Sequence, residues 1–108
     1  MLLRAFIEAG DTLKASGVTP YSIGAADGWT LTDLFENIYL RTAGPEMYDQ
    51  LATHEIPWTD QSVKDALETM AQIVGDADNI AGGTAGALET TFPASVQQAF
   101  KEDPDAAM

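Results

Sequence analysis

The stretch of residues 17–35 constrains the fold more than any other part of the sequence. Its first half predicts a short strand, Tyr21–Ala25, because β-forming residues alternate there after a Gly/Pro turn. An Ala-Asp-Gly loop, 26–28, follows this strand, since Asp-Gly favours turns. From Trp29 onward the apolar residues recur at helical spacing, and Thr30 is expected to be the N-cap. A strand, a tight loop and an apolar helix should therefore meet at Trp29.

This meeting point can hold a neutral polar ligand. An indole ring stacks on such a ligand, while a carboxylate and free helix N–H groups bond its hydroxyls. The alternative is that Trp29 packs into the core beside Phe35, as large aromatic side chains usually do. From the residues alone, packing is the favoured interpretation.

Helical spacing of apolar residues recurs along the rest of the chain. We expect helices from about Leu3 to Lys14, ended by Gly17; from Leu31 to Arg41; from Pro45 through Leu51; from a cap at Thr59 or Asp60 to Gly75; and from Pro93 to Phe100. The Gly-, Ala- and Asp-rich segment 76–86 is expected to be a loop. The sequence thus predicts a mainly α fold with one short β-strand and about five helices.

Charge and composition exclude several classes of partner. The chain carries 5 Lys and Arg against 17 Asp and Glu, for a net charge of -12. We therefore expect neither nucleic acid nor an anionic membrane surface as a partner, because their phosphates would be repelled. The chain has no cysteine, which rules out disulfides and thiol catalysis. No hydrophobic run has the length of a signal peptide or a membrane span.

Candidates for catalysis or metal binding are weak. His54 has no cysteine or second histidine to join it in a metal site or a relay, so a surface loop is expected. The segment Asp76–Asn79 begins like a calcium loop but lacks the following oxygen ligand and glycine. Gly82–Gly86 lacks the lysine of a phosphate-binding loop. Asp33 and Glu36 could act as paired carboxylates, although a solvated helix face is the simpler interpretation. No catalytic residue, metal ligand or cofactor is predicted.

Four segments resemble the middle of bacterial extracellular solute-binding proteins, most closely the carbohydrate-binding receptors of ABC importers. They are Lys14–Pro20, Ile23–Trp29, Phe35–Pro45 and Ile56–Val63. Such receptors are several times longer than this chain and have two α/β lobes joined by a hinge, with the sugar in the cleft between them. The resemblance implies that residues 1–108 are a single helical fragment, a partial lobe of a periplasmic-binding-protein-like α/β fold.

The resemblance also implies a ligand site. In these receptors the segment similar to residues 26–29 faces the cleft, so Asp27 and Trp29 become candidate ligand-binding residues. Gly28 is the backbone that lets a sugar ring approach, whereas Trp58 matches a position expected to pack. The implied partners are a carbohydrate and an ABC permease, in the periplasm or outside the cell, with or without a lipid anchor. Because one wall of the cleft is missing, we expect this chain to bind sugar weakly or not at all.

Two alternatives remain beside the receptor fragment. Amphipathic helices alone would also suit an independent helical protein-interaction domain, and a small hydrolase using Asp33, Glu36 or His54 ranks last. In the receptor family a segment like Ala106–Met108 begins a strand near the one like Tyr21–Ala25. If that edge lacks its partners here, an unpaired strand would favour self-association of the chain.

Overall fold

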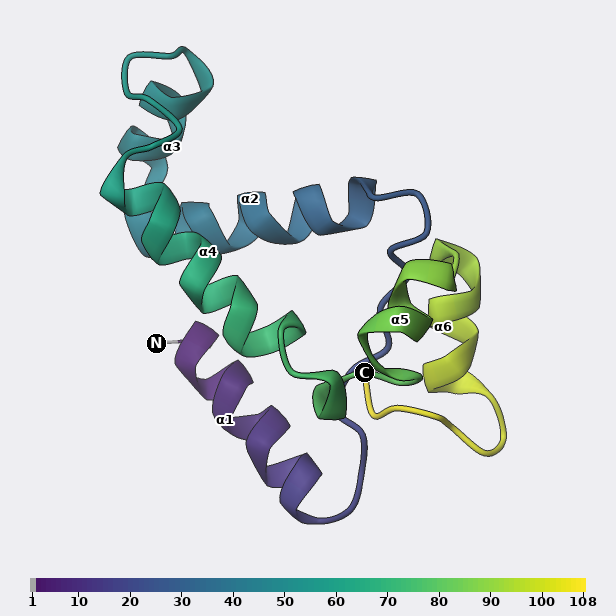
Figure 1. Ribbon diagram of the computed structural model, residues 1–108. Coiled ribbons are helices and arrows are strands. Elements are labelled where there is room, and N and C mark those ends of the chain that lie inside the picture. The colour runs from purple at the N-terminus through teal and green to yellow at the C-terminus, as the bar shows by residue number, and fades with distance from the viewer. Residues whose placement is uncertain (1) are drawn as a thin grey trace.

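The computed structural model describes residues 2–108 and contains six α-helices and one short 3₁₀ helix (Figure 1). Their bounds are α1 Leu2–Ala15, α2 Trp29–Ala43, α3 Pro45–Ala52, α4 Gln61–Val74, η1 Ala77–Asn79, α5 Gly83–Glu89 and α6 Phe92–Phe100. The predicted mainly α fold is confirmed. One helix, α5, lies where the sequence predicts a loop, and the predicted strand is reduced to a single bridge.

Several helix ends follow directly from local sequence. The Asp60 carboxylate caps α4 by accepting a hydrogen bond from the Ser62 N–H, as Asp does at N-cap positions. Thr91 caps α6 in the same way, through the Ala94 N–H. Pro45 opens α3, where its missing N–H has no helical partner to lose.

Helices α2 and α4 pack against each other and hold most of the core. The main cluster of buried residues is Tyr21, Ile38, Tyr39, Leu51, Val63, Ala66 and Ile73. A second, smaller cluster is formed by Ala25, Ile80 and Ala87. The long helix α2 spans the space between α3 at one end and the α5–α6 pair at the other (Figure 1). The chain therefore has two small cores, joined by α2, α4 and the segment that leads into α2.

The segment around Tyr21 forms backbone hydrogen bonds with two segments that are distant in the sequence. Tyr21 forms an isolated parallel bridge with Ile80. On the other side, the Met108 N–H donates to the Pro20 carbonyl and the Ser22 N–H donates to the Met108 carbonyl. The C-terminal residues thus run beside this segment, as the resemblance implies. The expected unpaired edge at Tyr21 is wrong, because both of its sides are bonded.

The strand predicted over Tyr21–Ala25 does not continue past its start. Instead of a neighbouring strand, the Ala25 N–H meets the Ala87 carbonyl at the end of α5, at 2.9 Å. Segment 76–86, predicted as a loop, contains η1 and the start of α5. Helix α5 forms despite its glycines because Ala87 packs against Ala25 and Ile80, and such tertiary contacts override weak propensity.

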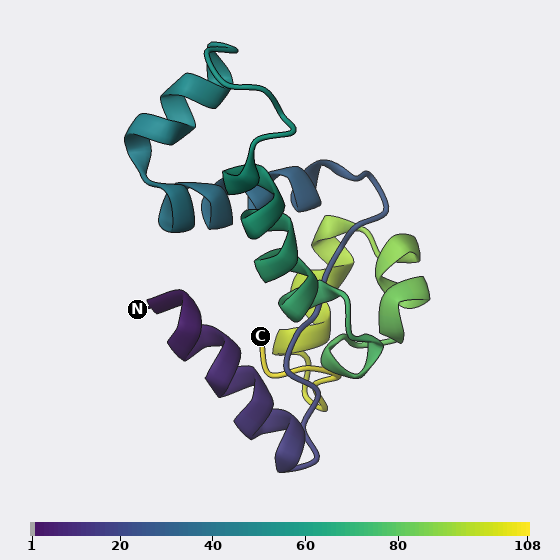
Figure 2. The ribbon, with the colours of Figure 1, turned by 60° about the vertical axis from the view of Figure 1, so that its left-hand side comes forward.

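The molecule is elongated rather than spherical. Its principal extents are 47 × 28 × 19 Å and its radius of gyration is 14.8 Å, whereas a compact domain of this length would have about 13 Å. Both ribbon views show α5 and α6 together at the end away from α3 (Figure 2). Among residues 2–108, no helix combines the length and the apolar character needed to cross a membrane.

Candidate functional site

The predicted ligand residues Asp27, Gly28 and Trp29 lie in a tight turn and at the first residue of α2. The Gly28 N–H donates to the Ala25 carbonyl at 3.1 Å, which closes the turn. Gly28 then occupies the helix N-cap position with φ 77°, a conformation that glycine adopts without strain. All three residues are exposed to solvent.

Thr30 fixes this turn in a way that the sequence did not indicate. It was predicted as the N-cap, but α2 begins one residue before it. Its hydroxyl donates instead to the Gly24 carbonyl, at 2.5 Å. Since Thr30 belongs to the first turn of α2, this bond ties the helix start back to the segment that precedes it.

The connection between α5 and α6 is hydrogen-bonded to the first residue of the turn. The Ala26 N–H donates to the Thr90 carbonyl at 3.1 Å. Gly24 lies so close to this connection that a Cβ atom there would be 2.5 Å from the Thr91 carbonyl oxygen. A glycine is therefore required at position 24 for the two backbones to approach, and the starts of α2 and α6 come together.

Trp29 contacts Phe92, the first residue of α6. Their ring centroids are 5.2 Å apart and the planes are tilted by 56°. The indole remains 47% exposed, so it is not sealed in the core. Phe35, the predicted core neighbour of Trp29, packs against Tyr39 and Trp58 instead. The aromatic pair of Trp29 and Phe92 is thus an exposed apolar surface, two residues after the exposed Asp27.

Phe92 is the residue of this site that sequence reasoning missed. Its spacing from Val96 and Phe100 indicated only the apolar face of a helix. Nothing local in the sequence predicts that residues 29 and 92 touch, because the contact depends on how α5 and α6 fold back onto residues 24–26.

The other residues considered for catalysis are all exposed to solvent. His54 is exposed in the connector after α3, with φ 62°. Asp33 and Glu36 are both exposed on α2, in agreement with a solvated face. Within residues 2–108, no group of three or more His, Asp or Glu side chains is arranged to hold a metal ion.

Two carboxylates have structural roles that lower their pKa. The pKa of Asp60 is held below its usual value by hydrogen bonds from the Ser62 hydroxyl and N–H. The pKa of Asp76 is lowered by the Asp78 N–H and by the Lys14 ammonium, whose nitrogen lies 3.0 Å from a carboxylate oxygen. The same ion pair raises the pKa of Lys14. Asp76, the first residue of the calcium-like segment, thus caps η1 and joins it to α1.

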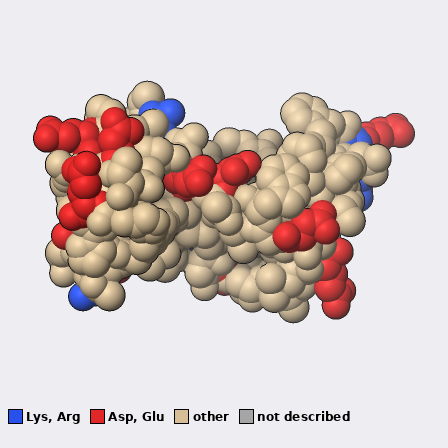
Figure 3. Space-filling view, turned by 90° about the horizontal axis from the view of Figure 1, so that it is seen from above, with Lys and Arg blue, Asp and Glu red and all other residues tan. Residues whose placement is uncertain are grey.

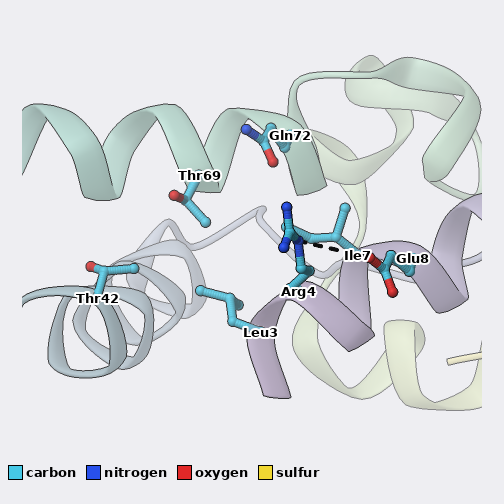
Figure 4. Close-up of a pocket in the computed structure, with 7 residues that line it drawn as sticks. All are labelled: Leu3, Arg4, Ile7, Glu8, Thr42, Thr69 and Gln72. Carbon is cyan, nitrogen blue, oxygen red and sulfur yellow. Dashed lines mark ion pairs between the residues drawn. The ribbon is translucent and has the colours of Figure 1, made fainter. Parts of the chain in front are cut away.

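A shallow hollow of about 290 Å³ lies between α1 and the helices α2 and α4. It is lined by Leu3, Arg4, Ile7, Glu8, Thr42, Thr69 and Gln72. Figure 4 shows Arg4 rising from α1 toward Gln72 of α4, with an ion pair to Glu8 of 3.8 Å. Both charged side chains are largely exposed, so this pair is weak. The hollow offers few fixed polar groups and is a poor candidate for a ligand site.

The surface charge is predominantly negative. The view from above shows carboxylates over both ends of the molecule and only a few basic groups (Figure 3), consistent with the net charge of -12. A negative surface of this kind repels polyanions and attracts cations.

Comparison with known proteins gives three similar sequences. The chain is 41% identical over 92 residues to the osmoprotective compounds-binding protein GgtB of Synechocystis sp., a match covering 82% of this chain and 22% of the relative. It is 34% identical over 98 residues to the alpha-glucosides-binding periplasmic protein AglE of Rhizobium meliloti, covering 87% and 21%. An uncharacterised ABC transporter extracellular-binding protein of Pyrococcus horikoshii is 31% identical over 64 residues, covering 59% and 14%.

The chain spans about a fifth of the length of the first two relatives. No protein-family model matches it, and no solved structure matches it significantly. All three relatives are named as binding proteins. The predicted resemblance is therefore confirmed, and over most of its length the chain is similar to a segment of the extracellular solute-binding proteins of ABC transporters.

Proposed function

We propose that this chain is the part of an exported solute-binding protein that forms one wall of a carbohydrate site, and that it binds rather than catalyses. The observation that carries the proposal is the half-exposed Trp29, which packs against Phe92 and follows the exposed turn that contains Asp27. The name of one relative, an alpha-glucosides-binding periplasmic protein, supports a glucoside as the ligand class.

The chemistry of the turn suits a sugar. A pyranose presents a face of C–H groups that can cover an exposed indole, and the contact with Phe92 limits the motion of that indole. The Asp27 carboxylate can accept hydrogen bonds from sugar hydroxyls, and hydrogen bonds to an ionised group are stronger than neutral ones. Gly28 has no side chain to block the approach of the ring.

One wall gives low affinity. Stacking on the indole contributes about 1 kcal/mol, and hydrogen bonds to the carboxylate add about 1.5–3 kcal/mol. The sum of about 2.5–4 kcal/mol corresponds to a dissociation constant of about 1 mM or weaker. Tighter binding requires a second wall, because enclosed sites bury most of the surface of their ligand.

The two tryptophans provide an internal control for this proposal. Trp29 is 47% exposed and Trp58 is 56% exposed, so a solute can contact both residues. We expect methyl α-glucoside to shift the Trp29 indole signal in ¹H–¹⁵N NMR spectra, with a dissociation constant of about 1 mM or weaker, and to leave Trp58 unmoved. The D27N variant should weaken this response.

Three results would contradict the proposal. A dissociation constant in the micromolar range would show that one wall is sufficient. A shift of Trp58 without Trp29 would place the site elsewhere. No shift at about 100-fold the expected dissociation constant would show that this wall alone does not bind a glucoside. The W58A variant is the matched control and should leave the Trp29 response unchanged.

In the whole protein, we propose that the bound sugar is delivered to an ABC permease, in the periplasm or at the outer face of the cell. The relatives named as periplasmic and extracellular binding proteins support this location. Radiolabelled glucoside uptake in cells that express the full-length protein tests the role. Loss of uptake in W29A, with normal export of the protein, is the expected result, whereas unchanged uptake would contradict it.

A second candidate role is protein interaction through α6. Val96 and Phe100 are exposed on one face of this helix, one turn apart, and Phe100 is 85% exposed. Exposed apolar patches often mark interaction surfaces, and we propose self-association as the contact. Light scattering after size exclusion tests it: a dimer that becomes monomeric in F100S is expected, and a monomer at high protein concentration would contradict it.

A further inference from the structure

A small cavity between α2, α3 and the connector to α4 is lined mainly by aromatic rings. We call it the aromatic pocket. Its volume is about 110 Å³. Its lining residues are Phe35, Glu36 and Tyr39 of α2, Tyr48, Leu51 and Ala52 of α3, and Trp58 of the connector. None of these residues belongs to the sugar site proposed above, so the two sites are independent.

The rings of the pocket are held in place by one another. Phe35 packs against Tyr39, with centroids 5.8 Å apart, and against Trp58, with centroids 5.9 Å apart. The ring centroids of Tyr39 and Tyr48 are 6.3 Å apart. The Tyr39 side chain is fully buried and its hydroxyl is 2.9 Å from the Ser62 hydroxyl. Tyr39 is thus held in place, and its hydroxyl already has a hydrogen-bond partner.

Glu36 and Trp58 connect the pocket to solvent. Both are exposed, and Phe35 and Tyr48 are partly exposed, so a solute can reach these two rings, whereas Tyr39 is closed off from solvent. Glu36 is the sole charged group among the lining residues. A solute that enters therefore meets several aromatic rings and one carboxylate.

Aromatic faces carry negative electrostatic potential, and a cation placed against them is attracted. The Glu36 carboxylate adds to this attraction, and the net charge of -12 raises the local concentration of cations. Alkylated ammonium groups suit aromatic pockets because their charge is spread over methyl groups that need no hydrogen bonds. We propose that the aromatic pocket binds a small quaternary ammonium group.

Size and polarity both argue against a sugar in this pocket. An apolar cavity of about 150 Å³ holds one benzene ring, so 110 Å³ suits a trimethylammonium group better than a pyranose. A sugar would also need several hydrogen-bond partners. The Tyr39 hydroxyl is already engaged by Ser62. The lining side chains therefore leave the hydroxyls of a sugar two partners, the Glu36 carboxylate and the Tyr48 hydroxyl.

The experiment compares choline with 3,3-dimethyl-1-butanol, which has the same shape and no charge. A W29F variant leaves Trp58 as the sole tryptophan and hence the reporter of the pocket. At constant ionic strength, we expect choline to change Trp58 fluorescence saturably and the neutral alcohol to bind at least about tenfold more weakly. E36Q should weaken choline binding several-fold and leave the response to the alcohol unchanged.

Matched variants separate the pocket from general electrostatics. D33N removes one carboxylate from the exposed face of the same helix without touching the pocket, so its choline affinity should equal that of the parent. Equal binding of choline and the alcohol would overturn the proposal, as would equal effects of E36Q and D33N or the absence of a saturable response. Circular dichroism of each variant excludes loss of the fold as the cause.

Discussion

Replacing Gly24 by alanine tests how the turn that carries Trp29 is held. A Cβ atom at this position would lie 2.5 Å from the Thr91 carbonyl oxygen and 2.8 Å from the Phe92 Cα atom. Both contacts are with backbone, which cannot rotate away as a side chain can. We expect G24A to lose about 2 kcal/mol of unfolding free energy, within the range for overpacked sites. Its melting temperature should fall by about 8–16 °C.

A second estimate of the cost of G24A comes from the hydrogen bonds that the clash disturbs. The Ala25 N–H meets the Ala87 carbonyl at 2.9 Å, and the Ala26 N–H meets the Thr90 carbonyl at 3.1 Å. Each such bond contributes about 1 kcal/mol, so losing both gives the same total. The displacement would also separate Phe92 from Trp29, and in a W58F background the indole emission should shift to longer wavelength.

The control for G24A is the same substitution at Gly86. A Cβ atom there would have its nearest contact at 3.5 Å, to the Ala81 carbonyl oxygen, which is an ordinary packing distance. Alanine is also the better helix former by about 1 kcal/mol, so G86A should be as stable as the parent or more so. Thermal and urea unfolding followed by circular dichroism measure both variants. The reasoning is refuted if G24A and G86A melt within about 2 °C of each other.

Ile38 is 1% exposed in the main core, so I38A is expected to lose about 2–5 kcal/mol in urea unfolding, and a loss below about 1 kcal/mol would contradict its place there. The pKa of Asp60 is lowered by Ser62, so this carboxylate stabilises the fold above its usual pKa and the stabilisation is lost as the pH falls through the lowered value. D60N should be less stable than the parent at neutral pH and should lose less of its stability in acid. Melting temperatures measured as a function of pH test this. A decline in acid equal to that of the parent would contradict it. Burial raises the pKa of Tyr21 from 10.0. We therefore expect the contribution of Tyr21 to stability to be complete below pH 10.0 and to be lost as the pH rises through the raised pKa. Y21F should remove this alkaline decline, and a decline equal to that of the parent would refute the assignment.

Helix boundaries that depend on local chemistry were predictable. Asp60 caps α4 and Pro45 opens α3 as expected, because an Asx side chain bonds nearby N–H groups and proline lacks an N–H of its own. The start of α2 was placed two residues late, since Thr30 resembles an N-cap. Its hydroxyl found the Gly24 carbonyl instead, a partner that only the folded turn supplies.

The sequence by itself determined the mainly helical architecture, the likeness to solute-binding proteins and the turn at residues 26–28, because apolar periodicity and turn residues act over a few positions. The tertiary structure decided which surfaces those elements make. It stopped the predicted strand at Tyr21 by pairing Ala25 with α5, and it placed Phe92 against Trp29. Contacts between residues so far apart along the chain depend on how all the helices pack, and local sequence carries no signal for them.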